Sequence, residues 1–184
     1  MSQSEFELDV VSVRLVKSTR VQAKDKIKDP ESAIKAAGNL LMDADREVVG
    51  VINLATDGTP INLHIASIGT LNATLVEPRE MLKASILSNA AKIIMVHNHP
   101  SGDMTPSRED IMITDRMAKV CTMVGIPLVD HVIVGGDNHS YFSFQEKGMV
   151  EYQGSIRYES DLEHIHLGKV AERSGRDEHK IHRR

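Results

Sequence analysis

Two histidines and an aspartate are the side chains in this sequence whose types and spacing best suit chemistry. His97 and His99 directly follow an apolar run that ends at Val96, and Asp110 comes eleven residues after the second histidine. Side chains two apart in an extended segment point the same way, so both imidazoles can face one point. Two nitrogen ligands and one carboxylate oxygen, with a fourth position left open, suit a hydrolytic zinc site, although iron(II) sites use the same set.

The residues between the histidines and the aspartate predict a strand–loop–helix junction. Residues 100–106 contain two prolines and a glycine, which favour a turn. A helical pattern opens at Ser107, which puts Asp110 in the first turn. Helical side chains lean toward the N-terminus, so Asp110 can meet the two imidazoles. Ser107 and Asp110 are also spaced as a capping box, a role that needs no metal.

A hydrolytic site also needs a base, and the candidates are Glu47, Glu77 and Glu80. Glu77 and Glu80 fall at a predicted helix start, where acids are expected as partners of the helix dipole. Glu47 instead precedes a buried strand, where a carboxylate has no obvious structural use. Periodicity alone therefore favours Glu47 only slightly.

Strands and helices alternate along the chain, which predicts a three-layer α/β domain with a mixed sheet flanked by helices. Residues 1–28 are expected to be an N-terminal extended segment with a possible edge strand up to about residue 17, and 29–154 to form the domain. The charged residues 155–184 are expected to form a flexible tail. Helices are expected at 30–44, from 78 and at 107–124, and strands at 48–54, 61–66, 93–96, 127–134 and 140–144.

Composition excludes several classes of protein. The chain is 41% hydrophobic and 26% charged, with a formal charge of −4, so it lacks the basic excess expected of a protein that wraps nucleic acid. Cys121 is the only cysteine, which rules out an intramolecular disulfide. The first nine residues are acidic, without the basic start of a signal peptide, and no apolar stretch is long enough to span a bilayer. We expect a cytoplasmic protein that does not enter a membrane.

Three strings in the sequence resemble the JAMM motif of JAB/MPN metalloproteases, whose fold is cytidine-deaminase-like: E-V-V-G-V-I (47–52), H-N-H-P (97–100) and S-R-E-D (107–110). Within that superfamily the chain most resembles the bacterial RadC-like JAB domain, over roughly residues 29–148. The further strings that carry this resemblance are V-E-P-R-E (76–80), H-N-H-P-S-G-D (97–103), T-P-S-R-E-D (105–110) and D-H-V-I-V-G-G (130–136).

The resemblance implies a role for each residue of the motif. His97, His99 and Asp110 would bind Zn²⁺, and Glu47 would hold and deprotonate the attacking water. Ser107 would steady the oxyanion of the tetrahedral intermediate. The implied reaction is hydrolysis of a peptide or isopeptide bond in a peptide or protein substrate.

A second hypothesis is a DNA-associated accessory protein, acting in repair or on mobile DNA, with a structural or vestigial metal site. The family name and the basic end of the chain motivate it, whereas the net charge argues against tight nonspecific binding. The short N-terminal segment is not expected to hold the helix-hairpin-helix region of full-length RadC proteins. Asp130 and His131 are either a pair that orients a ligand imidazole or simple strand packing. The sequence does not indicate an oligomeric state.

Overall fold

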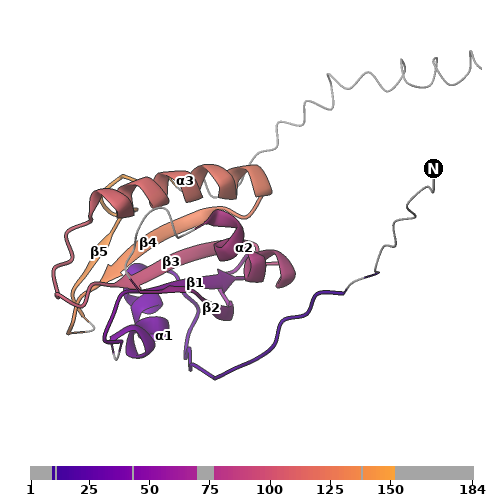
Figure 1. The fold of residues 1–184 in the computed structure, drawn as a ribbon, viewed down its shortest axis with the longest axis horizontal. Coiled ribbons are helices and arrows are strands. Elements are labelled where there is room, and N and C mark those ends of the chain that lie inside the picture. Colours follow the sequence, from indigo (N-terminus) through magenta and orange to yellow (C-terminus); the bar gives the residue numbers. More distant parts are fainter. Residues whose placement is uncertain (1–9, 11, 43, 70–76, 138, 152–184) are drawn as a thin grey trace, which may run out of the picture. The chain divides into compact units, whose positions relative to one another are not determined.

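A computed structural model describes residues 10, 12–42, 44–69, 77–137 and 139–151 (Figure 1). The chain divides into two units, Met1–Tyr152 and Gln153–Arg184, and all described residues belong to the first. The expected tail at 155–184 lies outside the described residues. The elements are α1 (Pro30–Met42), β1 (Val48–Leu54), β2 (Pro60–Ile68), α2 (Pro78–Leu87), β3 (Lys92–Asn98), α3 (Arg108–Val124), β4 (Leu128–Val134) and β5 (Tyr141–Ser143).

The strands form one mixed sheet in the order β2-β1-β3-β4-β5. β1 is antiparallel to both of its neighbours, β3 and β4 are parallel, and β5 returns antiparallel to β4. Figure 1 shows α1 on one side of the sheet and α3 on the other. These layers confirm the expected α/β class with a mixed sheet between helices.

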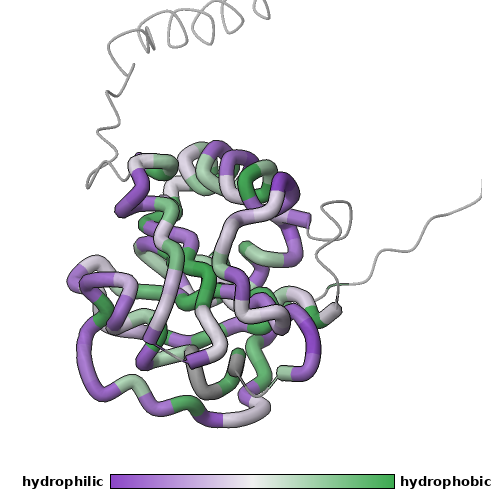
Figure 2. Tube along the Cα trace, turned by 90° about the vertical axis from the view of Figure 1, so that its left-hand side faces the viewer, coloured by the Kyte–Doolittle hydropathy of each residue, from purple (hydrophilic) through white to green (hydrophobic). Residues whose placement is uncertain are grey.

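The central strand β1 explains why its sequence is apolar along its whole length. All seven of its residues are buried, because helices cover both faces of the sheet. Val49 and Val51 pack with residues of α2 and α3, whereas Val48 and Ile52 pack with residues of α1. Figure 2 shows hydrophobic segments in the middle of the domain and hydrophilic ones mainly around it.

Local capping chemistry sets the ends of the helix that carries Asp110. Ser107 is the N-cap of α3 and forms a full capping box with Asp110. The C-cap is Gly125, with φ of 77° in the left-handed region that glycine adopts without steric cost. The helix therefore begins and ends where the sequence predicts.

The expected edge strand in the N-terminal segment is wrong for its described part. Residues 10 and 12–17 lie in neither helix nor strand, and Val13 is 70% exposed. Alternating apolar residues give a strand only where a neighbouring backbone accepts the ladder hydrogen bonds, and the edge strands of the sheet are β2 and β5. Within the described ranges no helix combines the length and apolar character that a bilayer crossing needs.

Candidate metal centre

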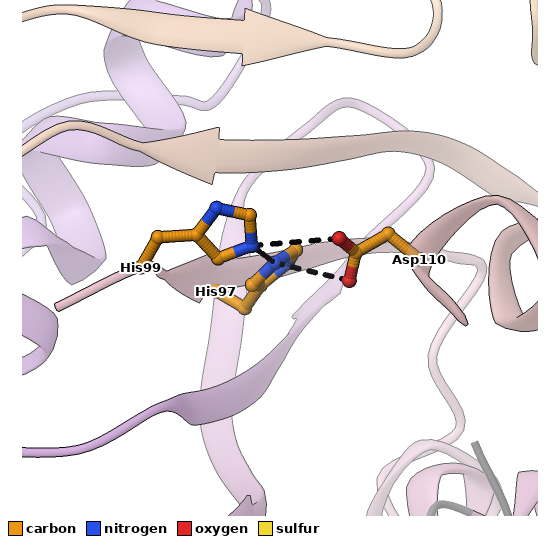
Figure 3. A group of neighbouring side chains, drawn as sticks. All are labelled: His97, His99 and Asp110. Atoms are coloured by element: carbon orange, nitrogen blue, oxygen red, sulfur yellow. Dashed lines mark hydrogen bonds and ion pairs between the residues drawn. The ribbon is translucent and has the colours of Figure 1, made fainter. Parts of the chain in front are cut away.

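The three predicted ligands converge at one end of the sheet (Figure 3). One ligand atom from each of His97, His99 and Asp110 lies within 4.8 Å of the others. The two Nε2 atoms are 2.8 Å apart. His97 Nε2 lies 3.3 Å from Asp110 Oδ1, and His99 Nε2 lies 3.4 Å from Asp110 Oδ2. His97 and Asp110 are buried, while the His99 side chain is 12% exposed.

The capping box fixes the carboxylate of Asp110. Its Oδ2 accepts hydrogen bonds from the backbone N–H of Ser107 at 2.7 Å and from the Ser107 hydroxyl at 2.6 Å. Its Oδ1 is buried and has no hydrogen-bond partner. A buried oxygen without a donor is costly, and here it lies 3.3 Å from His97 Nε2. Capping and metal ligation are therefore compatible roles of Asp110, one for each oxygen.

A chain of hydrogen bonds behind His97 determines which of its nitrogens carries the proton. The Thr114 hydroxyl donates to the Asp110 carbonyl at 2.5 Å, so its oxygen accepts from His131 Nδ1–H at 2.6 Å. Neutral His131 then has a bare Nε2, which accepts from His97 Nδ1–H at 2.7 Å. The His97 Nε2 atom is left with its lone pair, in the state that a metal ligand needs.

His99 reaches the same state through a different partner. Its Nδ1 lies 2.5 Å from the backbone carbonyl of Asp103, which can only accept, so Nδ1 carries the proton and Nε2 the lone pair. Two lone pairs 2.8 Å apart, beside a carboxylate oxygen without a donor, form a group that could hold a cation. The donor set N, N, O fits a divalent metal ion held by three protein ligands.

The pKa shifts follow from burial and from the carboxylate. Burial lowers the pKa of His97 to about 4, against the raising effect of Asp110. The hydrogen bond with Asp110 raises the pKa of His99 despite partial burial, with contributions from the Asp103 carbonyl and Glu47. Burial opposes ionisation of Asp110, but His99, His97 and Ser107 together lower its pKa. His97 and Asp110 are thus held in their ligating forms at neutral pH.

Glu47 lies on the ligand side of the sheet. Val49 of β1 pairs with His97 of β3 in antiparallel register, and residues two apart on a strand share a face. Glu47 therefore shares the face of Val49 and His97. Its charge makes the smallest contribution to the raised pKa of His99, after those of Asp110 and the Asp103 carbonyl. Glu47 as a whole is half-buried.

The two residues Asp130 and His131 have separate roles. His131 is fully buried, stacks on Phe144 with ring centroids 4.8 Å apart, and contacts His97 directly. Asp130 instead accepts from the backbone N–H of His131 and from the Ser143 hydroxyl, so it ties β4 to the end of β5. Thr114 was missed by sequence reasoning, although its position four residues after Asp110 puts both on one helix face.

The fold and the centre define the class: an α/β domain of the JAB type with a His-His-Asp group that could hold a metal ion. The sequence model of the RadC-like JAB domain family matches residues 27–149 of this chain. The chain therefore belongs to this family.

Three similar proteins support the family assignment, and all three are named UPF0758 protein. A UPF0758 protein of Desulforamulus reducens is 41% identical over 124 residues, covering 67% of this chain and 54% of that protein. A UPF0758 protein of Methanosarcina mazei is 36% identical over 130 residues, covering 71% and 56%. One from Thermotoga maritima is 45% identical over 104 residues, covering 56% and 46%. The chain thus spans about half the length of these curated relatives.

Proposed function

We propose that this protein is a zinc-dependent hydrolase that cleaves peptide or isopeptide bonds. The observation that carries the proposal is the pair of Nε2 lone pairs that converge with the unpartnered Asp110 Oδ1, beside a half-buried glutamate. Zinc suits this donor set and, when bound, supplies a Lewis acid that polarises a carbonyl and makes water more acidic.

Glu47 and Ser107 would then have separate roles in the reaction. Glu47 takes the proton of the attacking water and returns it to the leaving amine, which its half-buried position allows. Ser107 is exposed at the helix start and donates to Asp110 Oδ2. To steady an oxyanion, its hydroxyl must turn from that oxygen toward the substrate, while its backbone N–H keeps the carboxylate in place.

The first experiment measures metal, not turnover. Untagged protein purified without added ions is analysed by mass spectrometry, beside His97→Ala. We expect about one zinc per chain in the wild type and a large loss in the variant. A wild type as metal-free as His97→Ala would remove the foundation of the proposal.

The second experiment concerns the base. Glu47→Gln should retain zinc, because Glu47 is not among the three convergent ligands, but should lose turnover of a peptide or isopeptide substrate found by screening. Undiminished hydrolysis would exclude Glu47 from the reaction.

A nucleic-acid-associated role is a second candidate, favoured by the described N-terminal segment. Residues 12–28 contain six lysines and arginines and one acid, and most of these side chains are exposed. Such a segment would bind phosphates in a salt-dependent way. Replacing Arg14, Lys17 and Arg20 by alanine should then reduce DNA binding and flatten its salt dependence. Wild-type protein that binds no DNA at low salt would rule this role out.

A further inference from the structure

The residue between the two histidines, Asn98, contacts the backbone on both sides of Glu47. Its side chain is buried, with 5% of the residue exposed. Its Oδ1 accepts from the backbone N–H of Val48 at 2.8 Å, and its Nδ2 donates to the carbonyl of Arg46 at 3.1 Å. Both groups belong to the neighbours of Glu47, so one carboxamide holds the peptide units next to that residue.

These contacts continue the sheet where its backbone ladder ends. The register between β1 and β3 runs to the pair Val49–His97, while Asn98 itself pairs with Val134 of β4. A carboxamide presents one face as acceptor and one as donor, as a peptide group does. The Asn98 side chain therefore takes the place of the next rung. On the other side of β1, the backbone N–H of Gly69, the residue after β2, donates to the Glu47 carbonyl at 2.8 Å.

We propose that Asn98 is a positioning residue for Glu47, an inference that rests on the proposed role of Glu47 as the base. Successive strand residues point to opposite faces, so His97 and His99 face the centre while Asn98 faces away and reaches β1. The end of β3 thus positions the two imidazoles directly. Through Asn98 it also positions the Glu47 carboxylate, which must lie beside them. A displacement of about 1 Å in such a group can cost about 100-fold in rate.

Asparagine is the residue type that this junction requires. Alanine would leave the buried N–H of Val48 and the carbonyl of Arg46 without their partner, so the start of β1 would be free to shift. Aspartate would keep the bond from Val48 but place an oxygen against the Arg46 carbonyl. The ligand imidazoles keep their own partners, His131 and the Asp103 carbonyl, in either variant.

The test compares Asn98→Ala with Glu47→Gln and with a matched control, Asn53→Ala. Asn53 is also a buried asparagine, on β1, but its amide donates to the Asn62 side chain and not to the backbone near Glu47. Each protein is loaded with Co²⁺, and the pH midpoint of its visible absorption spectrum is measured together with the Co²⁺ affinity. A carboxylate beside the ion affects that midpoint, whereas a general loss of stability does not.

We expect Asn98→Ala to bind Co²⁺ within about threefold of wild type and to move the midpoint at least half as far as Glu47→Gln, in the same direction. Asn53→Ala should keep the wild-type midpoint. The double variant Asn98→Ala/Glu47→Gln should match Glu47→Gln alone, since Asn98 acts through that residue. On a substrate, kcat should fall with KM little changed.

Two failures can be told apart. A wild-type midpoint in folded Asn98→Ala, with a shifted one in Glu47→Gln, overturns the role of Asn98 alone. An unshifted Glu47→Gln overturns both this inference and the assignment of the base. If Asn98→Ala does not fold, Asn98→Asp is measured instead, and a midpoint equal to wild type in it overturns the inference.

Discussion

The hydrogen-bond chain behind His97 predicts that Thr114→Val weakens metal binding although Thr114 touches no metal ligand's donor atom. Valine is close to threonine in shape but cannot accept the proton of His131 Nδ1. Without that acceptor, His131 can turn to the opposite tautomer and donate from Nε2 to His97 Nδ1. His97 then carries its proton on Nε2, where it points at Asp110 Oδ1, 3.3 Å away. This inverted arrangement satisfies the buried groups without a metal and blocks ligation.

The size of the effect follows from the cost of restoring the ligating tautomer. Metal binding forces His131 Nδ1–H back against a methyl group in a fully buried position, and a buried donor without a partner costs about 1–3 kcal/mol. Partners of metal-bound histidines are worth about 10–100-fold in affinity, which corresponds to about 1.4–2.7 kcal/mol. We therefore expect the zinc dissociation constant of Thr114→Val to rise about 10–100-fold.

The assay is competition for zinc against a chromophoric chelator at fixed pH. Thr122→Val is the matched control, because the Thr122 hydroxyl also donates to the carbonyl four residues earlier, at 2.9 Å, but is exposed near the other end of α3. It should leave the affinity within about threefold of wild type, and Thr114→Ser should restore most of the loss. A folded Thr114→Val protein that binds zinc as tightly as Thr122→Val would refute the tautomer reasoning.

Three further outcomes follow from the structure. Burial raises the pKa of Cys121 to about 12, so thiol reagents at pH 8 should label the native protein roughly a thousandfold more slowly than the unfolded one; rapid native labelling would contradict this. Ser107→Ala removes the N-cap of α3 and should lower the unfolding free energy in urea by about 1 kcal/mol, and an unchanged midpoint would show that the cap adds nothing. Because the pKa of His97 is lowered to about 4 and that of His99 is raised above 6.5, zinc displaces one proton between pH 5 and 6.5, from His99. The logarithm of the apparent affinity should therefore rise with a slope of one as pH increases, and a slope of two would mean that His97 is protonated as well.

Local spacing was enough to predict the convergence of the three ligands. The two histidines alternate on one strand, and Asp110 follows in the first turn of a helix reached through a short loop, so few arrangements are open to them. The fold class followed from the alternation of strongly patterned strands and helices. The choice of Glu47 over Glu77 and Glu80, by contrast, came from the family resemblance, because strand periodicity cannot tell which strand start adjoins which strand end.

The contacts of the supporting residues could not be fixed from the sequence, because they depend on the register between strands. The sequence left open whether Asp130 and His131 orient a ligand imidazole or only pack on their strand. His131 meets His97 because β4 lies parallel to β3 with His131 opposite Met95, and no local pattern fixes that offset. Asn98 reaches β1 only where the ladder between β1 and β3 ends. The N-terminal edge strand failed for the same reason, because alternation says nothing about whether a partner strand is present.

The contacts around the centre form a closed ring that starts and finishes at Asp110. Hydrogen bonds run from the Asp110 carbonyl through Thr114 and His131 to His97, and the lone pair of His97 Nε2 then faces the Asp110 carboxylate, 3.3 Å away. Along these hydrogen bonds a change of tautomer at one member forces the next member to change, so Thr114, His131 and His97 must rearrange together. Such a centre is expected to switch between assembled and dismantled forms as a single step, without partly organised states between them.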